Sequence, residues 1–399
     1  MTTTTTIPAV AATSGGRGRR RKITATLAIT QTVGYGVLTY SFPVLLTPIS
    51  ADLHATKAAV AGAMTVAVLA GGAAALPIGR WLDRRGGRAL MSTGSILAVL
   101  AVVAWSQVSS IGQLYLVFLL MGLAGAMSLY EAAFPVIIAA HEPRQRDRAL
   151  LAVTIVAGFA SSIFFPLTGV LLAAFGWRHA LLMLAAILAV TTIPAHVLMV
   201  PSQGEHRVRR HAHLGVGVRE ALRDRRFWLI AVAFVAHAAA VNAVGVLLVS
   251  YLQTAGHTAM FAATVSGLLG VLSVTGRLVT TGLARRHGMI AVTAAVFAVQ
   301  AVGAAALPLL GRTGVGAAAC VVAFGIGFGV ATIARPAILA DRYGTHRYAT
   351  IAATMTMLIT FAKAIAPTAA ATTGGGFLPL AAGLCLISAL LLWKTHQTQ

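Results

Sequence analysis

The sequence predicts an all-α integral membrane protein with twelve transmembrane helices in two six-helix bundles. Three observations carry this prediction: an apolar composition, long apolar runs separated by short charged gaps, and one long polar stretch near the middle. Of the 399 residues, 58% are hydrophobic and only 10% are charged, whereas a soluble domain is about 45–50% apolar and about 25% charged. Because so little polar surface cannot cover a water-soluble body of this size, we expect the chain to lie in a lipid bilayer.

A membrane-spanning helix needs about 20 mostly apolar residues. Twelve runs of the chain meet this requirement: 23–50, 58–79, 89–108, 111–139, 149–175, 179–200, 227–253, 260–284, 289–310, 313–339, 349–373 and 376–393. The one long separator is polar and divides the runs into six and six. The predicted segments are a disordered basic tail (1–22), an N-terminal bundle (23–200), a central cytoplasmic loop (201–226), a C-terminal bundle (227–394) and a C-terminal tail (395–399).

The positive charges predict the orientation. Cytoplasmic segments of membrane proteins carry an excess of Lys and Arg. With both termini inside, 24 of the 30 Lys and Arg residues fall in cytoplasmic segments and three in outer loops. We therefore expect cytoplasmic N and C termini. The formal charge of +21 needs no nucleic-acid partner, because the cations occupy gaps between apolar runs rather than one basic face.

The two halves share a loop pattern. The segment 79–86 reads GRWLDRRG between runs 2 and 3, and 281–288 reads TGLARRHG between runs 8 and 9. The separation of the two loops along the sequence nearly equals the separation between the first residues of the two six-helix halves. Parallel six-helix repeats with binding near the membrane midplane are an architecture of secondary transporters.

The loop at 79–86 resembles the G-x-L-a-D-R-x-G loop between helices 2 and 3 of the major facilitator superfamily, and the resemblance covers about residues 23–394. It implies the fold of that superfamily. It also implies that Asp83 interacts with the N-terminal end of helix 11 and closes the cytoplasmic side when the carrier faces outward. The predicted gate residues are Gly79, Asp83, Arg84, Gly86 and Arg88. The alternative is that the loop only anchors the topology.

The second copy departs from this pattern. Arg285 stands where the first loop has Asp83, and Thr281 stands where it has Gly79. A charge gate repeated in both halves is therefore not expected.

Three further stretches, 35–53, 148–181 and 270–288, resemble the monocarboxylate and oxalate/formate branch of the superfamily. In that branch an arginine of helix 8 is associated with the substrate carboxylate, and Arg277 occupies this helix here. The resemblance thus implies a small anionic solute.

Polar and ionisable side chains inside the runs are the candidate binding and coupling residues. A charge at the centre of a span costs about 2.5–3.5 kcal/mol on insertion scales, so each invites a functional hypothesis. The ionisable candidates are Glu131, His237, Arg277, Arg335 and Lys363, in runs 4, 7, 8, 10 and 11. Run 1 adds a polar stripe, whose spacing places Gln31, Thr32, Tyr35 and Thr39 on one side of a helix.

Each candidate has a second interpretation. Glu131 is a candidate carrier of the coupling proton, because burial favours a neutral carboxyl, or it makes a structural ion pair. Arg277 and Arg335 could bind an oxyanion through two parallel hydrogen bonds, although Arg277 is near enough to the cytoplasm to snorkel. Lys363 could be an electrostatic element, and a lone histidine such as His237 often only hydrogen-bonds a neighbour.

Together these features predict a secondary active transporter that moves a small organic anion, such as a monocarboxylate, by alternating access and with proton coupling. The alternatives are a carrier that exports drugs or toxic oxyanions and a non-transporting sensor. Exporting antiporters of the superfamily carry an arginine four residues before a glycine in helix 4. Here Phe118 stands at that position, four residues before Gly122, so this antiporter feature is missing.

No enzyme, metal site or cofactor is expected, since the sequence has no nucleotide-binding loop and its two cysteines lie in apolar runs. The excess of Arg over Lys, 26 against 4, favours a GC-rich bacterial genome. We expect a monomeric, multi-pass protein of the bacterial inner membrane, whose partners are the lipid bilayer, a small solute and a proton.

Overall fold

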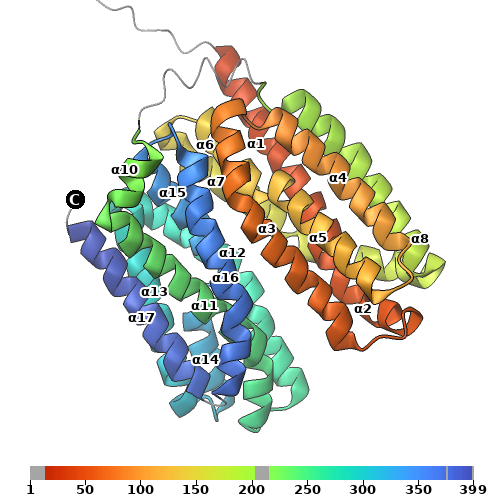
Figure 1. Ribbon diagram of the computed structural model, residues 1–399. Coiled ribbons are helices and arrows are strands. Elements are labelled where there is room, and N and C mark those ends of the chain that lie inside the picture. The colour runs from red at the N-terminus through yellow and green to blue at the C-terminus, as the bar shows by residue number, and fades with distance from the viewer. Residues whose placement is uncertain (1–13, 203–214, 374–375, 398–399) are drawn as a thin grey trace, which may run out of the picture.

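The computed structural model of the chain is all-helical and forms two bundles that lie side by side (Figure 1). It describes residues 14–202, 215–373 and 376–397. The all-helical prediction is confirmed. Helix α1 begins at Ser14, so residues 14–22 of the predicted tail continue the first helix. The pairing of Arg20 with Glu142 on the neighbouring helix supports this extension. Residues 1–13 and most of the central loop lie outside the described residues.

The N-terminal bundle packs around buried aromatic side chains. The ring of Phe118 lies edge-on to Trp105 and Phe42, with centroids 5.0 and 5.1 Å apart. Its elements are α1 (Ser14–Tyr35), the π-helix η1 (Gly36–Tyr40), α2 (Ser41–Asp52), α3 (Lys57–Arg85), α4 (Arg88–Ser106), α5 (Ile111–Ser128), α6 (Tyr130–Ala140), α7 (Pro143–Gly158) and α8 (Ala160–Met199).

The C-terminal bundle has a core of the same kind, in which Phe234 and Phe297 lie edge to face with centroids 6.0 Å apart. Its elements are α10 (Val218–Arg223), α11 (Arg225–Thr254), α12 (Ala259–His287), α13 (Met289–Leu310), α14 (Gly314–Gly325), α15 (Ala331–Tyr343), α16 (Tyr348–Thr372) and α17 (Phe377–Gln397).

Ten helical runs in the described residues are long and apolar enough to cross a membrane, where the sequence predicts twelve. Two features account for the difference. Predicted runs 5 and 6 lie in one helical stretch, which bends at Gly176 with φ +73°. Predicted run 10 consists of α14 and α15 on either side of a turn at 326–330, and α14 alone is too short to span. The number twelve therefore stays a prediction.

Three membrane helices are interrupted near their middle. The first run changes to π-helix over Gly36–Tyr40, and Leu129 separates α5 from α6 with ψ −155°. The turn at 326–330 separates α14 from α15. A proline follows each of the last two breaks, Pro135 and Pro336, and proline cannot donate the hydrogen bond that would continue the preceding turn. Such breaks leave backbone groups and side chains free to face a binding cavity.

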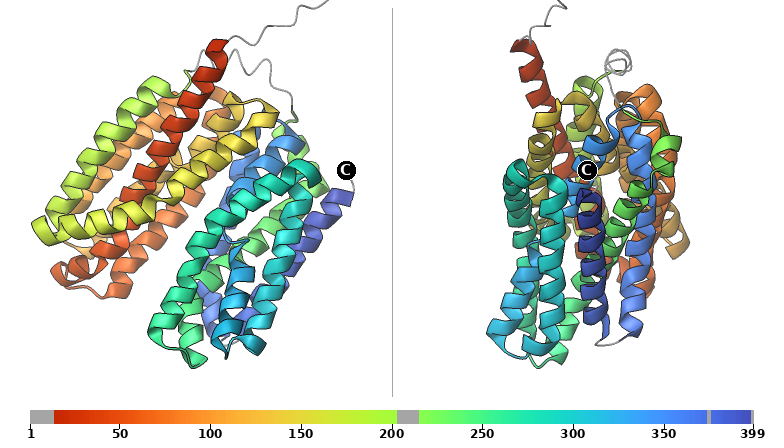
Figure 2. Two further views of the ribbon diagram at one scale, coloured as in Figure 1. Left: turned by 180° about the vertical axis from the view of Figure 1, so that it is seen from behind. Right: turned by 90° about the vertical axis from the view of Figure 1, so that its left-hand side faces the viewer.

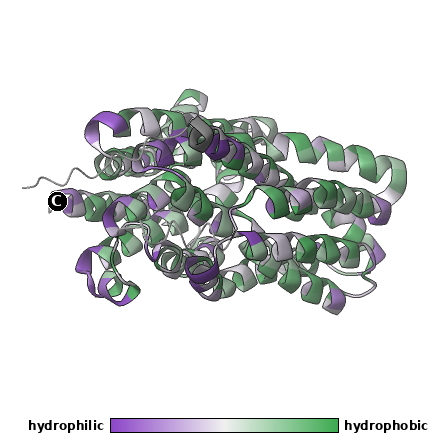
Figure 3. Cartoon of the chain, turned by 90° about the horizontal axis from the view of Figure 1, so that it is seen from above, coloured by the Kyte–Doolittle hydropathy of each residue, from purple (hydrophilic) through white to green (hydrophobic). Residues whose placement is uncertain are grey.

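The bundles approach each other at one end and diverge toward the other (Figure 2). We call the first of these the linker end; it holds the N-terminal part of α1, the short helix α10 and the C-terminal part of α17 (Figure 1). Across the interface α3 packs along α16, while α7 packs on α12 and α15. From above, the helices are mostly hydrophobic and the hydrophilic segments concentrate at helix ends and loops (Figure 3), as expected for helices surrounded by lipid.

Candidate functional site: a gate and a central cavity

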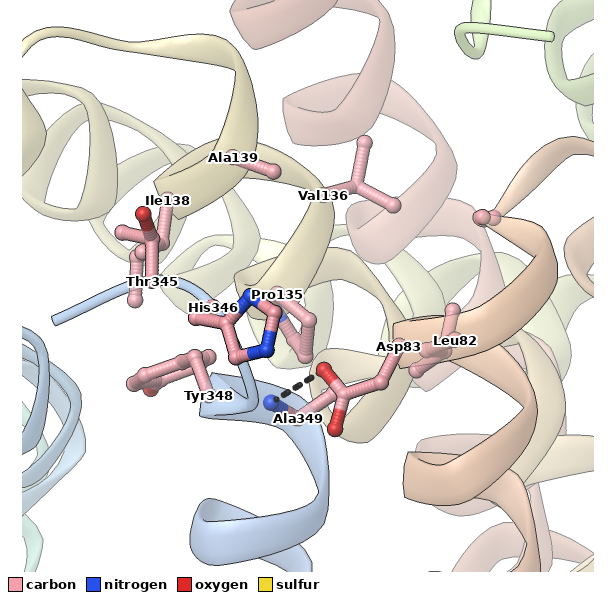
Figure 4. A pocket seen from close by; sticks show the side chains of 12 residues that line it. Leu82, Asp83, Pro135, Val136, Ile138, Ala139, Thr345, His346, Tyr348 and Ala349 are labelled. Carbon is pink, nitrogen blue, oxygen red and sulfur yellow. Dashed lines mark hydrogen bonds between the residues drawn. The ribbon is translucent and has the colours of Figure 1, made fainter. Parts of the chain in front are cut away.

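Asp83, near the C-terminal end of α3, joins the two bundles at the linker end. Its carboxylate is buried and accepts hydrogen bonds from the backbone N–H groups of Ala349 and Thr350, at 3.1 and 2.8 Å. The Thr350 hydroxyl donates a third, at 2.5 Å. These groups belong to the first turn of α16, where backbone N–H groups lack partners within the helix and carry partial positive charge. Figure 4 shows the carboxylate pointing at this turn.

Gly79 sets how closely α3 approaches α16. A Cβ atom at this position would lie 2.5 Å from the Ala349 carbonyl oxygen and 2.7 Å from the Ala353 Cβ. No side chain fits there without separating the helices. Gly79 lies one helical turn before Asp83, so it brings the carboxylate within hydrogen-bonding distance of α16.

The other predicted gate residues have different positions. Gly86 ends α3 with φ +77°, a backbone conformation that favours glycine. Arg88 donates to the Val200 carbonyl at 2.7 Å, a contact within the N-terminal bundle. Arg84 is exposed at the linker end and lines a groove between α3 and α10. The structure therefore places Gly79 and Asp83 at the interface itself and the other three around it.

A central cavity of about 280 Å³ lies between the bundles. Glu131 reaches it from the first turn of α6, and Lys363 reaches it from α16, so opposite charges face one cavity from opposite bundles. The Lys363 side chain is exposed and lines the cavity, and its ammonium interacts electrostatically with Glu131. The first turn of α6 favours negative charge at Glu131 through its free N–H groups.

The rest of the cavity wall mixes hydroxyl groups with apolar side chains. Thr39 contributes from η1, and Thr356 and Thr360 contribute from α16. The remaining wall is made of glycine, alanine and larger apolar residues. The apolar lining residues with side chains larger than alanine are Leu38, Met64, Val68, Met121 and Leu129. The cavity can therefore surround a small solute that has one charged group and an apolar body.

Arg277 on α12 also crosses the interface. Its guanidinium donates to the Thr154 carbonyl of α7 at 2.9 Å and to the Gly329 carbonyl in the break before α15 at 3.2 Å. A third hydrogen bond goes to the Ser273 hydroxyl at 3.1 Å. The guanidinium fork is thus directed at carbonyls of both bundles. In this conformation Arg277 supports the closed linker end.

Comparison with known proteins gives the family. The sequence model described as Major Facilitator Superfamily matches residues 27–367. The chain belongs to the major facilitator superfamily. It is therefore a multi-pass membrane transporter and not an enzyme.

Solved carriers of this superfamily have the same fold. The bacterial homologue of the iron transporter ferroportin, in an outward-facing state, has a TM-score of 0.74 and 14% identity over 94% of this chain and 98% of its own. The E. coli fucose:proton symporter has a TM-score of 0.71 and 15% identity, covering 93% and 98%. The human organic anion transporter TETRAN has a TM-score of 0.69 and 16% identity, covering 95% and 100%. No curated protein matches the sequence. At these identities the likeness shows the fold alone, and the monocarboxylate branch stays a prediction.

Within this superfamily fold, the polar residues predicted in run 1 separate into two groups. Thr39 lines the cavity. Gln31 donates to the Ser128 carbonyl at 2.9 Å, just before the break in run 4, and the Thr32 hydroxyl donates to the Ala28 carbonyl in its own helix. The Tyr35 ring packs against Tyr130, with centroids 4.7 Å apart. Gln31 and Tyr35 thus support the helix break near Glu131, Thr32 bonds within its own helix, and none of these three lines the cavity.

The remaining ionisable candidates also lie away from the cavity wall. His237 hydrogen-bonds the Gln300 side chain at 2.8 Å and stacks on Phe297 at 3.7 Å, inside the C-terminal bundle. The Gln300 amide continues this network to the Phe324 carbonyl at the end of α14. Arg335, on α15, is half-buried and lies close enough to Lys363 for their charges to interact.

Sequence reasoning missed three polar residues near the cavity. Thr356 and Thr360 line it one turn apart on α16, and the Asn242 amide of α11 donates to the Lys363 carbonyl at 2.5 Å. Positions 356, 360 and 363 are four and three residues apart, so their side chains lie on one face of a helix, and this spacing is visible in the sequence. We predicted only Lys363 of that stripe, because threonines are common in apolar helices and carry no signal alone.

A second charged cluster lies at the linker end, where α7 meets α15. Burial and the negative charge of Asp147 raise the pKa of Asp341 to about 6, although Arg146 acts in the opposite direction. Nearby, Asp224 accepts from the Tyr343 hydroxyl at 3.0 Å and lies 3.6 Å from Arg342. Burial acts to raise the pKa of Asp224, but hydrogen bonds from the Arg226 N–H and Tyr343 and the charge of Arg342 hold it below its usual range.

Proposed function

We infer that this carrier moves a small organic anion, in the class of the monocarboxylates, together with a proton. The observation that supports this proposal is the pair of opposite charges, Glu131 and Lys363, that face one cavity from opposite bundles. A cation in a largely apolar cavity attracts a carboxylate more strongly than it does in water. The cavity volume of about 280 Å³ suits a solute of a few carbon atoms.

The same pair supplies a route to proton coupling. In the empty cavity the ammonium of Lys363 stabilises the carboxylate of Glu131. When an anionic solute binds Lys363, Glu131 loses its partner beside a second negative charge, and protonation removes the repulsion. Solute and proton therefore bind together. The loaded cavity holds a neutral carboxyl and an ion pair of solute with Lys363.

Release of the gate then allows alternating access. In the conformation described, the Asp83 and Arg277 contacts close the linker end. The distribution of Lys and Arg supports placing this end, and with it both termini, on the cytoplasmic side of the membrane. Rocking of the bundles breaks these contacts and exposes the cavity to the cytoplasm.

The test is uptake of labelled small acids into proteoliposomes, with and without an inward-directed proton gradient. We expect accumulation driven by the gradient in wild type. Glu131→Gln should lose that accumulation and keep exchange of labelled for unlabelled acid, since Lys363 still binds the anion. Lys363→Gln should lose both activities, and Lys363→Arg should keep part of them. The matched control is Lys57→Gln, at the exposed start of α3. Unchanged acid uptake in Lys363→Gln rules the proposal out.

The apolar wall favours a second candidate. Met64 and Met121 both line the cavity, and methionine adapts to apolar ligands of different shapes. Such a wall suits export of hydrophobic toxic compounds. This candidate predicts that expression protects cells against such compounds, whereas the anion proposal predicts no protection.

A further inference from the structure

The linker end contains a second cavity, unrelated to the central one. It is a groove of about 710 Å³ between α3 of the N-terminal bundle and α10 and α16 of the C-terminal bundle. Five arginines and one histidine line it: Arg80, Arg84, Arg219, Arg223, Arg347 and His346. Among the described residues no acidic side chain lines this groove.

The groove keeps an excess of positive charge over the carboxylates near it. None of its five arginines forms an ion pair or a side-chain hydrogen bond within the described part of the chain. Three acids lie close by. Asp83 accepts hydrogen bonds from α16 and acts on Arg347 through its charge, Asp224 pairs with Tyr343 and Arg342, and Glu220 on α10 is exposed and does not line the groove. Because like charges held close together repel, the groove is left with a strong preference for an anion.

Tryptophans place the groove at the depth of the lipid headgroups. Trp81 lies on α3 between Arg80 and Arg84 and is 36% exposed. Trp228, 45% exposed, donates from its indole N–H to the Leu222 carbonyl at 2.9 Å and so fastens α10 to the start of α11. Exposed tryptophan is typical of the boundary between hydrocarbon and water. The arginines therefore lie where phosphate groups of lipids and of cytoplasmic solutes both have access.

We propose that this groove binds a phosphate-bearing anion that bridges the two bundles. Guanidinium groups bind phosphate oxygens through paired, charge-assisted hydrogen bonds. Arg80 and Arg84 supply them from one bundle, and Arg219 and Arg223 supply them from the other. The ligand is either the headgroup of an anionic phospholipid or a free phosphate compound.

The bridging position gives the site a regulatory effect. Opening of the linker end moves α3 away from α10 and α16 and so separates the two pairs of arginines. The anion therefore binds the closed conformation more tightly than the open one, and its binding shifts the population toward the closed state. Transport slows when the groove is saturated.

The experiment measures stabilisation of the full-length protein in nanodiscs of neutral phosphatidylcholine. One arm replaces part of the lipid with phosphatidylglycerol, and the other adds inorganic pyrophosphate. A ligand that binds only the folded protein raises Tm with concentration. We expect a rise in at least one arm. A rise with lipid alone assigns the headgroup, and a rise with pyrophosphate alone assigns a free phosphate compound.

The variants test the groove and the bridge separately. Arg80→Gln/Arg84→Gln and Arg219→Gln/Arg223→Gln should each raise the ligand concentration for half the maximal shift about tenfold or more. Arg219→Lys/Arg223→Lys, which keeps the charge and loses the fork, should lie between wild type and the glutamine variant. The matched control is Arg285→Gln/Arg286→Gln, two exposed arginines at the end of α12. It removes the same charge and should stay within about twofold of wild type.

Three results overturn the proposal. Absence of a Tm rise in both arms removes the site. If ligand binding weakens equally in the α12 control variant, only the general surface charge attracts the anion. If ligand binding weakens in only one of the two glutamine double variants of the groove, the anion does not bridge the two bundles. Every variant is first compared with wild type in Tm without ligand, so that a folding defect is recognised.

Discussion

Asp83 and Thr350 are 267 residues apart in the chain, and two hydrogen bonds of 2.8 and 2.5 Å join them across the bundle interface. The acceptor is a buried carboxylate and the donors belong to a helix N-terminus. Interactions of this kind contribute about 0.3–1 kcal/mol, and up to ~2 kcal/mol when partly buried. That range is large enough to favour one conformation and small enough for the carrier to reverse.

Asp83→Asn should shift the protein toward the open linker end. Asparagine keeps the shape of the side chain but has one carbonyl oxygen and no charge to offer the two N–H groups. Single-molecule FRET between dyes on Ala89→Cys and Ala291→Cys, at the linker ends of α4 and α13, measures this opening. The native cysteines Cys320 and Cys385 are buried, which limits unwanted labelling. We expect the open population to increase about twofold to tenfold.

The control for Asp83→Asn is Asp52→Asn, which removes an ion pair with Arg178 inside the N-terminal bundle. It should leave the FRET distribution unchanged. An unchanged distribution in Asp83→Asn itself contradicts the assignment of this carboxylate to the gate.

Gly79→Ala should prevent full closure of the linker end. The added Cβ meets the Ala349 carbonyl at 2.5 Å, so α3 and α16 must separate and the Asp83 contacts weaken. Transport should fall severalfold, and the FRET distribution should broaden toward opening. Gly383→Ala on α17 is the control, because nothing lies within 4 Å of its Cβ position. Alanine there should be neutral or stabilising, since it favours helix by up to about 1 kcal/mol over glycine.

Acid should favour the closed linker end through Asp341. Its pKa is about 6 in the closed state, and it should return to the usual value of about 3.9 when opening restores water around the carboxyl. Between these values the closed state binds a proton that the open state does not, so closure becomes more favourable as pH falls. Above pH 6 the carboxyl is charged in both states, so the burial of its charge and the repulsion by Asp147 both oppose closure fully.

The measurement for Asp341 is the open fraction by FRET from pH 7.5 to about pH 4.5. Wild type should close as pH falls through this window, and Asp341→Asn should be more closed at pH 7.5 and lose most of the dependence. Glu220→Gln, an exposed acid on α10, serves as the control. A pH profile of Asp341→Asn that matches wild type excludes this group as the origin.

Replacement of Arg277 should affect turnover more than apparent affinity. In the closed state its guanidinium is occupied by the Thr154 and Gly329 carbonyls. Arg277→Gln should therefore lower the maximal rate of acid uptake about tenfold, with a KM within about threefold of wild type. Initial rates in proteoliposomes give both values, with Arg286→Gln as the control. If KM rises and the maximal rate is unchanged, Arg277 instead contacts the solute.

The sequence predicts the membrane location, the bundle architecture and the partner helix of Asp83, because composition and one loop motif carry that information. It does not predict where the helix breaks at Leu129 and at 326–330 fall, because the nearby prolines, Pro135 and Pro336, lie inside the helices that follow the breaks and do not mark the breaks themselves. Polar residues within the apolar runs identify candidate positions, but they do not show which face of the helix meets the cavity. Gln31 and Thr39 illustrate this, since one supports a helix break and the other lines the cavity.

The shared cavity of Glu131 and Lys363 has an electrical consequence. In the proposed cycle the empty cavity contains one carboxylate and one ammonium, and the loaded cavity contains a neutral carboxyl, an ammonium and an anion. The sum of these charges is zero in both cases. Both membrane crossings are then electroneutral, so the transmembrane voltage does no work on either one. Concentration and pH differences alone set the direction of net flux.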